Sequence, residues 1–273
     1  MDVILLGTGS PLPSPDRAGP ATLVRAGGLD LLFDCGRGVL MRAAAAWSGP
    51  LSFATVFLTH LHSDHVTDFN DLVTSRWALS PVPDPLVVVG PVGTQRFVDR
   101  TLEMLSDDIG YRLDHHADLT EGPQVQVTEV SDGVVFERGG VRVLAAPTDH
   151  APVRPTVGYR VEHEGKAVVI AGDTVPCPGL DRLCEGADVY VQTVIRPSII
   201  RQIPSARLQD VIDYHSSVEQ AAQTAARHGV GTLVLTHPVP PPTPGTEQEW
   251  IDEAAAHFSG PVVLGTDLTS ITA

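Results

Sequence analysis

The chain has 273 residues, of which 42% are hydrophobic, and its formal net charge is -15 at pH 7. This length and composition are sufficient to bury a large core, and we expect one compact domain over residues 1–273. The negative charge repels phosphate backbones at long range, which counts against broad nucleic-acid binding.

Apolar runs rich in Val, Ile and Leu recur from the N-terminus onward and predict β-strands, with helical patterns between several of them. Many of the predicted strands are continuously apolar, so sheets covered on both faces are expected and the predicted class is α/β with layered sheets and helices. The predicted strands are residues 3–6, 29–33, 54–58, 86–89, 141–145, 167–171, 189–191, 232–235 and 262–264. The predicted helices are residues 38–47, 68–79, 94–106, 180–184, 218–228 and 247–258.

The apolar run at the N-terminus is short, because Gly7 follows it, and the basic start of a secretion signal is absent. No later window predicts a membrane span. Cysteine is scarce, at Cys35, Cys177 and Cys184, and none lies in a CxxC pair. An odd number of cysteines argues against a disulfide framework and fits a reducing compartment. We therefore expect a cytoplasmic protein that has no contact with a membrane.

Three imidazoles and one carboxylate lie within six residues, directly after the predicted strand 54–58. Without a partner, these groups would repel and desolvate one another, but together they offer nitrogen and oxygen donors suited to a zinc-like cation. If the strand continues to His62, then His60 and His62 share one face, and a turn can bring Asp64 and His65 from another side. The segment is predicted to serve two adjacent metals, and the alternative is a polar surface turn.

Further polar residues follow other predicted strands. Asp173 follows strand 167–171, and His237 stands where strand 232–235 meets its loop. Ser216 and Glu219 match a capping box that starts a helix, which places His215 just ahead of that helix. Because ligand sites in α/β sheets favour the carboxyl edge of the strands, we expect these donors to meet at one rim.

The chain resembles the metallo-β-lactamase fold superfamily and, within it, the ribonuclease Z-like branch, most closely the actinobacterial proteins of that branch. The resemblance covers nearly the whole chain and implies the four-layer αββα sandwich of the family. It rests on short motifs in the family's order, namely Leu6-Gly7-Thr8-Gly9-Ser10, Phe33-Asp34-Cys35-Gly36, residues 59–65, Thr148-Asp149-His150, Ala171-Gly172-Asp173-Thr174, His215-Ser216-Ser217 and Leu235-Thr236-His237.

The resemblance also implies two metal ions, with Zn²⁺ as the first choice and Mn²⁺ or Fe²⁺ as alternatives. One ion would be held by His60, His62 and His150, the other by Asp64, His65 and His237, with Asp173 bridging the two. Taken alone, a histidine such as His150 or His237 could be structural, and Asp173 could cap a helix. Asp34 is interpreted as a support that orients a histidine ligand by accepting its second ring proton.

Two metals at such a site can share a hydroxide, and the expected activity is in-line hydrolysis of a phosphodiester by that bridging hydroxide. Asp64 would orient the nucleophile or accept its proton, and His215 would lie beside the metals as a non-ligand that stabilises charge or protonates the leaving oxygen. The second position of the histidine motif in residues 59–65 is His62, whereas the di-iron redox relatives have a glutamate there, so the resemblance favours a hydrolytic centre. Asp173 stands where lactamases often have cysteine, which disfavours lactam cleavage.

Relatives that process tRNA carry a long flexible arm between the positions of His150 and Asp173, and here that interval is too short. A small phosphodiester or related ester is therefore ranked above RNA as the expected substrate, and tRNA 3'-processing endoribonuclease is an alternative. The same centre could also serve an arylsulfatase, thioesterase or lactonase, or it could belong to a non-catalytic metal-dependent binding protein. The resemblance also implies a homodimer, with residues 195–214 as a candidate subunit contact or pocket wall.

Overall fold

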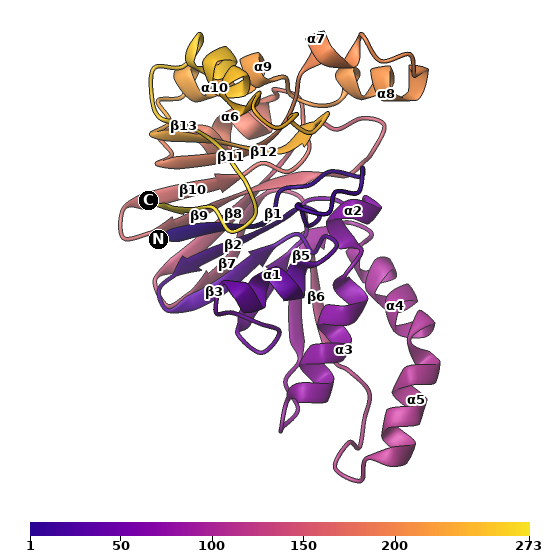
Figure 1. Cartoon of the computed structure of the whole chain (residues 1–273). Helices are drawn as coiled ribbons and strands as arrows, with labels where there is room; N and C mark the ends of the chain where they lie inside the picture. The colour runs from indigo at the N-terminus through magenta and orange to yellow at the C-terminus, as the bar shows by residue number, and fades with distance from the viewer.

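The computed structural model describes residues 1–273 and contains two seven-stranded sheets that face each other (Figure 1). The first sheet has the spatial order β14 (Ser270–Thr272), β1 (Asp2–Gly7), β2 (Ala21–Ala26), β3 (Leu29–Phe33), β4 (Phe53–Phe57), β5 (Leu86–Pro91) and β6 (Val125–Val130). The second has the order β13 (Val262–Leu264), β12 (Thr232–Val239), β11 (Val189–Ile195), β10 (Lys166–Ile170), β9 (Val157–His163), β8 (Val141–Pro147) and β7 (Gly133–Arg138).

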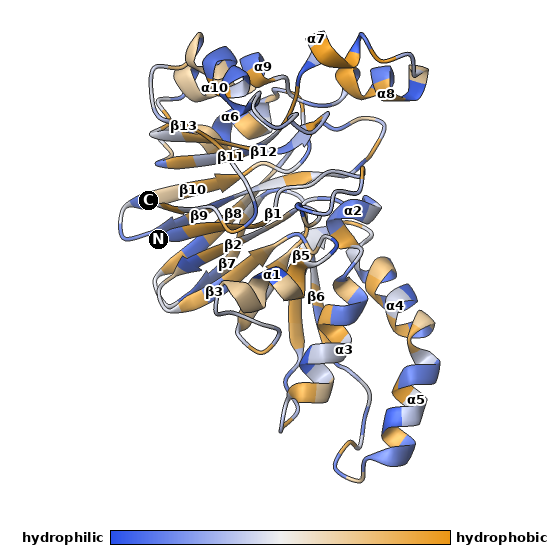
Figure 2. Cartoon of the chain, viewed as in Figure 1, coloured by the Kyte–Doolittle hydropathy of each residue, from blue (hydrophilic) through white to orange (hydrophobic).

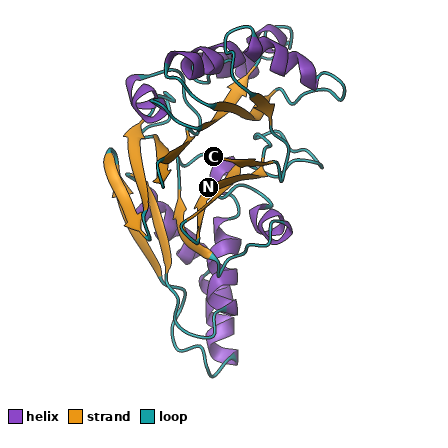
Figure 3. Ribbon diagram, turned by 90° about the vertical axis from the view of Figure 1, so that its left-hand side faces the viewer, coloured by secondary structure: helices purple, strands orange, loops and turns teal.

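Helices cover the outer face of each sheet, so that the strands lie between two helical layers (Figure 3). The first sheet packs against α1 (Val39–Ala45), α3 (Phe69–Leu79) and α4 (Thr94–Met104), and the second against α6 (Pro178–Cys184), α9 (Val218–Arg227) and α10 (Glu247–Ala255). The remaining helices are α2 (Ser63–Val66), α5 (Ser106–His115), α7 (Pro197–Ile200), α8 (Ala206–Asp210) and the 3₁₀ helix η1 (Val211–Asp213). The expected αββα four-layer sandwich of the α/β class is confirmed.

The continuously apolar strands follow from this layering, because successive side chains of a strand point to opposite faces. In β1, Val3 and Leu5 face the other sheet, while Ile4 and Leu6 face the helices. In β12, Val234 faces the other sheet, while Leu233 and Leu235 face the helices. Apolar colouring accordingly runs along the inner strands in Figure 2.

The strands that precede the candidate ligands all end at one edge of the sandwich. β3, β4 and β5 are parallel, and so are β10, β11 and β12. β8 runs in the direction of β10, because both pair antiparallel with β9. The carboxyl ends of these strands and the residues just after them carry Asp34, His60, His150, Asp173 and His237.

All nine predicted strands and all six predicted helices are present, but five strands, the ten-residue α5 and four short helices were not predicted. The missed β6 and β7 are partly exposed and contain charged residues, so they lack the apolar signal of the interior strands. The predicted cap at Ser216 is wrong by one residue: Ser217 caps α9 and pairs with Gln220 in a capping box. Ser216 lies one residue before the N-cap, and its hydroxyl donates a hydrogen bond to the Thr174 carbonyl.

None of the helices combines the length and the apolar character that crossing a bilayer requires.

Candidate metal centre

The structure brings all seven predicted metal ligands together at the carboxyl edge of the sheets, in two adjoining groups. Within each group, one potential ligand atom from every residue lies within 4.8 Å of the others. The groups divide as the sequence predicted, with His60, His62, His150 and Asp173 in one, and Asp64, His65 and His237 in the other. Side chains that are far apart in the chain therefore offer two adjoining sets of donors.

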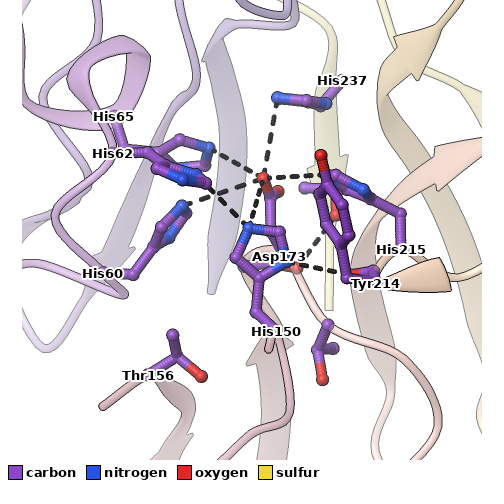
Figure 4. A network of polar contacts seen from close by, with 12 residues as sticks. His60, His62, His65, His150, Thr156, Asp173, Tyr214, His215 and His237 are labelled. Atoms are coloured by element: carbon purple, nitrogen blue, oxygen red, sulfur yellow. Dashed lines mark hydrogen bonds and ion pairs between the residues drawn. The ribbon is translucent and has the colours of Figure 1, made fainter. Parts of the chain in front are cut away.

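Asp173 lies at the middle of the cluster, and contacts from five histidines converge on it (Figure 4). Its Oδ2 atom is 3.8 Å from Nε2 of His60 and of His150, 3.5 Å from Nε2 of His65 and 3.9 Å from Nε2 of His237. The carboxylate thus faces donors of both groups. The backbone just before Asp173 requires glycine at position 172. The φ of Gly172 is +66°, and a Cβ on this residue would lie 2.7 Å from the Cβ of Thr59.

Three of the histidines are held through Nδ1, which leaves Nε2 directed at the centre. His65 Nδ1 donates to Asp34 at 2.7 Å, and His150 Nδ1 donates to the Tyr214 carbonyl at 2.8 Å. His60 Nδ1 lies 3.0 Å from the Thr59 hydroxyl. Histidine ligands of a metal usually have this arrangement: a hydrogen-bond partner on one ring nitrogen fixes the direction of the second ring nitrogen, which binds the metal.

Several buried polar atoms of the cluster have no hydrogen-bond partner within the protein, which is the main physical argument that cations fit this site. Orphaned buried polar atoms are rare in folded proteins because each one has lost its contact with water. Here four of them belong to candidate ligands: Nε2 of His60, Nε2 of His65, Oδ1 of Asp173 and Nδ1 of His237. Imidazole nitrogens and carboxylate oxygens are suitable donors for zinc-like cations.

The electrostatics of the cluster agree with this interpretation. Burial lowers the pKa of His60 well below its usual range and that of His150 to about 4, so both are neutral, as ligands must be. Burial opposes charge on Asp173, but His237 and His65 hold its pKa well below the ordinary value. Burial also opposes charge on His65, yet Asp173 and Asp34 raise its pKa well above the usual range, so positive charge is favoured at this position and a bound cation would replace the ring proton.

Asp34 takes the supporting position that the sequence predicted. Its carboxylate accepts hydrogen bonds from His65 Nδ1 at 2.7 Å and from the Thr59 amide at 2.8 Å. Its φ is +59°, a conformation that non-glycine residues seldom adopt, immediately after β3. Thr59, which sequence reasoning missed, connects Asp34 to His60 through its hydroxyl.

Asp34→Asn is expected to weaken metal retention by about 10–100-fold, because an amide is a poorer acceptor for His65 Nδ1. The measurement is metal content after dialysis against graded chelator. Asp30→Asn provides a matched control, since Asp30 lies on β3, the strand that precedes Asp34, but pairs with Arg25 away from the cluster. Equal metal retention in both variants would remove Asp34 from the support of the site.

His215 contacts the cluster through Asp173. Its Nδ1 donates to the Val211 carbonyl at 2.9 Å, and its Nε2 lies 3.3 Å from Asp173 Oδ2. Burial lowers the pKa of His215, but the hydrogen bond to Asp173 and the charge of that carboxylate outweigh burial and raise it. The neighbouring Tyr214, which supplies a carbonyl to His150, was not predicted because a backbone acceptor leaves no mark on residue type.

Two local expectations about the ligand segments are wrong. β4 ends at Phe57, so His60 and His62 are brought together by the turn before α2 and not by an extended strand. β12 does not end before His237 but continues to Val239, with a shift in its pairing to β11 between Thr193 and Ile195. His237 has a φ of +51° within this irregular stretch. A bulge of this kind redirects a side chain without ending the strand.

The histidines given no role in the sequence lie outside the cluster. His115 and His116 are exposed at the end of α5. His228 pairs with Asp181 at 2.9 Å. The segment 195–214 contributes to a small apolar cluster in which Ile200 is buried against Ile195 and Val239.

Comparison with known proteins gives a consistent result. A family model described as the Beta-lactamase superfamily domain matches residues 30–238. Proteins named ribonuclease Z from Mycobacterium avium and Mycobacterium tuberculosis are 58% and 53% identical over 270 residues, covering 98% of this chain and 96% of each relative. The crystal structure of human tRNase Z, short form, has a TM-score of 0.73 at 25% identity, covering 100% of this chain and 99% of that one. The metallo-β-lactamase fold protein YhfI from Bacillus subtilis has a TM-score of 0.75 at 21% identity, covering 99% and 98%.

Proposed function

Because this chain belongs to the β-lactamase superfamily and, within it, to the ribonuclease Z family of metal-dependent hydrolases, we propose that it cleaves a phosphodiester bond of RNA at the 3' end of tRNA precursors. The observation that carries the proposal is the pair of donor groups around Asp173, with His215 against the same carboxylate. The name ribonuclease Z on full-length relatives supplies the substrate class.

We propose that His60, His62 and His150 hold one cation, that Asp64, His65 and His237 hold another, and that Asp173 bridges them. Zinc is the proposed metal because it accepts mixed imidazole and carboxylate ligands, with Mn²⁺ or Fe²⁺ as alternatives. When bound, two such cations supply a hydroxide nucleophile at neutral pH and screen charge on the phosphoryl group. Elemental analysis of the purified protein identifies the metal and its stoichiometry.

The side chains of the protein would then position the nucleophile and move protons. Asp64 Oδ2 lies 3.2 Å from His237 Nε2, so the carboxylate is held within the second donor group and can accept the proton of the attacking water. His215, on the other side of Asp173, would donate a proton from Nε2 to the leaving oxygen of the RNA. The anchored Nδ1 atom of His215 fixes the direction of that donation.

The comparisons do not support the ranking of a small substrate above RNA, because the full-length relatives carry the name ribonuclease Z. The argument for a small substrate used the interval between His150 and Asp173, which is largely filled by β9 and β10 and leaves no room for a long arm. A missing arm removes one way of holding RNA but leaves the hydrolytic centre intact. Hydrolysis of a small phosphodiester remains the second candidate function.

The metal-loaded protein is expected to cut a 3'-extended tRNA precursor on the 3' side of the discriminator nucleotide, which end mapping of the products detects. The control substrates are nitrophenyl phosphodiester, sulfate, lactone and thioester compounds, which test for arylsulfatase, thioesterase and lactonase activity. Turnover of the small diester without any cut in RNA would favour the second candidate. No hydrolysis of any substrate by a fully metallated sample would favour a binding protein.

The homodimer and the cytoplasmic location stay predictions. α1 and the turn after it expose Met41 to 79% and Trp47 to 94%, and large exposed apolar side chains of this kind are typical of subunit contacts. Light scattering measures the oligomeric state directly. Three free cysteines, two of them buried, agree with a reducing compartment.

A further inference from the structure

A groove lies beside the candidate metal centre, between the ligand segment and α4. It is lined by Leu61, Arg96, Phe97, Arg100 and Met104, among others. Leu61 stands between the candidate ligands His60 and His62 in the sequence, so the ligand segment contributes one wall of the groove. A Cβ on Gly93 would lie 3.5 Å from Leu61 Cδ1 and 3.6 Å from Arg96 Nη2, so both side chains flank the same point of the backbone. Figure 1 shows α4 beside α2, with α5 extending away from the sheets.

The two arginines of this groove are free of the ion pairs that occupy most cations of this acidic chain. Arg96 and Arg100 are exposed, and neither has a carboxylate within 4.0 Å or any side-chain hydrogen bond. Asp99 and Glu103 follow Arg96 and Arg100 by three residues on α4, but neither lines the groove, and Asp99 accepts a hydrogen bond from Gln95. In this structure the two guanidinium groups are therefore unpaired and available to an anionic partner.

The spacing and surroundings of the arginines fit an RNA strand. Residues four apart on a helix lie on one face, so Arg96 and Arg100 point to the same side of α4. Guanidinium groups bind phosphate oxygens through paired N–H donors. Phe97, Leu61 and the exposed Met104 line the same groove and add apolar surface beside the arginines, which suits bases or sugars.

We propose that Arg96 and Arg100 bind the phosphate backbone of the single-stranded RNA adjoining the scissile bond, and that the groove takes the nucleotides next to the metal centre. This proposal rests on the proposed function. The groove would supply a surface that holds RNA on a chain whose interval between His150 and Asp173 has no room for an arm. Its two arginines would also place positive charge near the centre, where the net charge of -15 would otherwise repel RNA.

The test compares the double variant Arg96→Gln/Arg100→Gln with wild type on a 3'-extended tRNA precursor, with both proteins fully metallated. The KM for the precursor is expected to rise about 10-fold or more while kcat stays near wild type. The slope of log(kcat/KM) against log salt is expected to become shallower by about 1.4, which is about 0.7 for each lost contact to a single-strand phosphate. Arg96→Lys/Arg100→Lys should recover most of that slope, since charge is retained.

Arg138→Gln is the matched control. Arg138 is also exposed and without an ion pair, but it lies at the turn between β7 and β8, at the end of the sheet opposite His150. Wild-type KM and salt slope in the Gln double variant, with the precursor still cleaved, would overturn the role of the arginines and leave the proposed function standing. Failure of wild type to cleave any RNA would instead reject the proposed function. Loss of bound metal or of kcat in the double variant would also count against a phosphate contact.

Discussion

Asp173→Ala is expected to remove both metal ions and to lower turnover by at least about 10³-fold, since the loss of a single charge-stabilising donor costs about 10²–10³-fold in other hydrolases. The physical reason is the position of this carboxylate between the two donor groups, with Nε2 of His60 at 3.8 Å and Nε2 of His65 at 3.5 Å from the same oxygen. Without Asp173, Asp64 would be the one carboxylate left among the proposed ligands. The repulsion between two adjacent cations would then be poorly screened.

Metal analysis and calorimetry measure this result independently of activity. Metal that binds the folded protein raises its melting temperature, so wild type should gain stability when metal is added after chelation, and Asp173→Ala should gain little. Asp181→Ala is the matched control, because Asp181 also pairs with a histidine, His228, but lies on α6 outside the cluster. Should the alanine variant fail to fold, Asp173→Asn keeps the shape of the side chain. Full metal content in a folded variant would disprove the bridging role.

His215→Ala is expected to retain both metals and to lower diester turnover by about 10²-fold or more, the scale of a lost acid catalyst. The imidazole contacts Asp173 through Nε2 and is held by the Val211 carbonyl through Nδ1, so it is fixed beside the donor groups without belonging to either of them. Acid catalysis acts on the leaving oxygen. The variant should therefore lose less activity on a substrate whose leaving group needs no proton, such as a nitrophenyl diester, than on RNA.

That difference between leaving groups separates proton donation from a structural role. If His215 only holds Asp173 in place, the variant would lose metal, and both substrates would be affected equally. His228→Ala controls for the loss of a histidine–aspartate contact elsewhere in the protein. Unchanged RNA turnover in a fully metallated His215→Ala sample would remove this residue from the mechanism.

The sequence alone was sufficient to predict the fold class and to name the seven side chains that the structure gathers into two donor groups. Strand and helix signals are local, so runs such as residues 3–6 and 167–171 identified interior strands directly, and the two apolar faces of each strand indicated sheets covered on both sides. Motifs in the family order named all seven candidate ligands. Local pattern failed at the partly exposed strands β6 and β7, whose polar and charged residues interrupt the apolar run, and also at the largely buried β2 and β9.

Only the tertiary structure decided how these residues are held. Asp34 lies 31 positions from His65 in the sequence, and His150 is fixed by a carbonyl at Tyr214, which no residue pattern reveals. The arginine groove likewise depends on α4 packing beside Leu61. Residue type determines what chemistry is available, but contacts between segments that are distant in the sequence determine orientation, because only the fold brings those segments together.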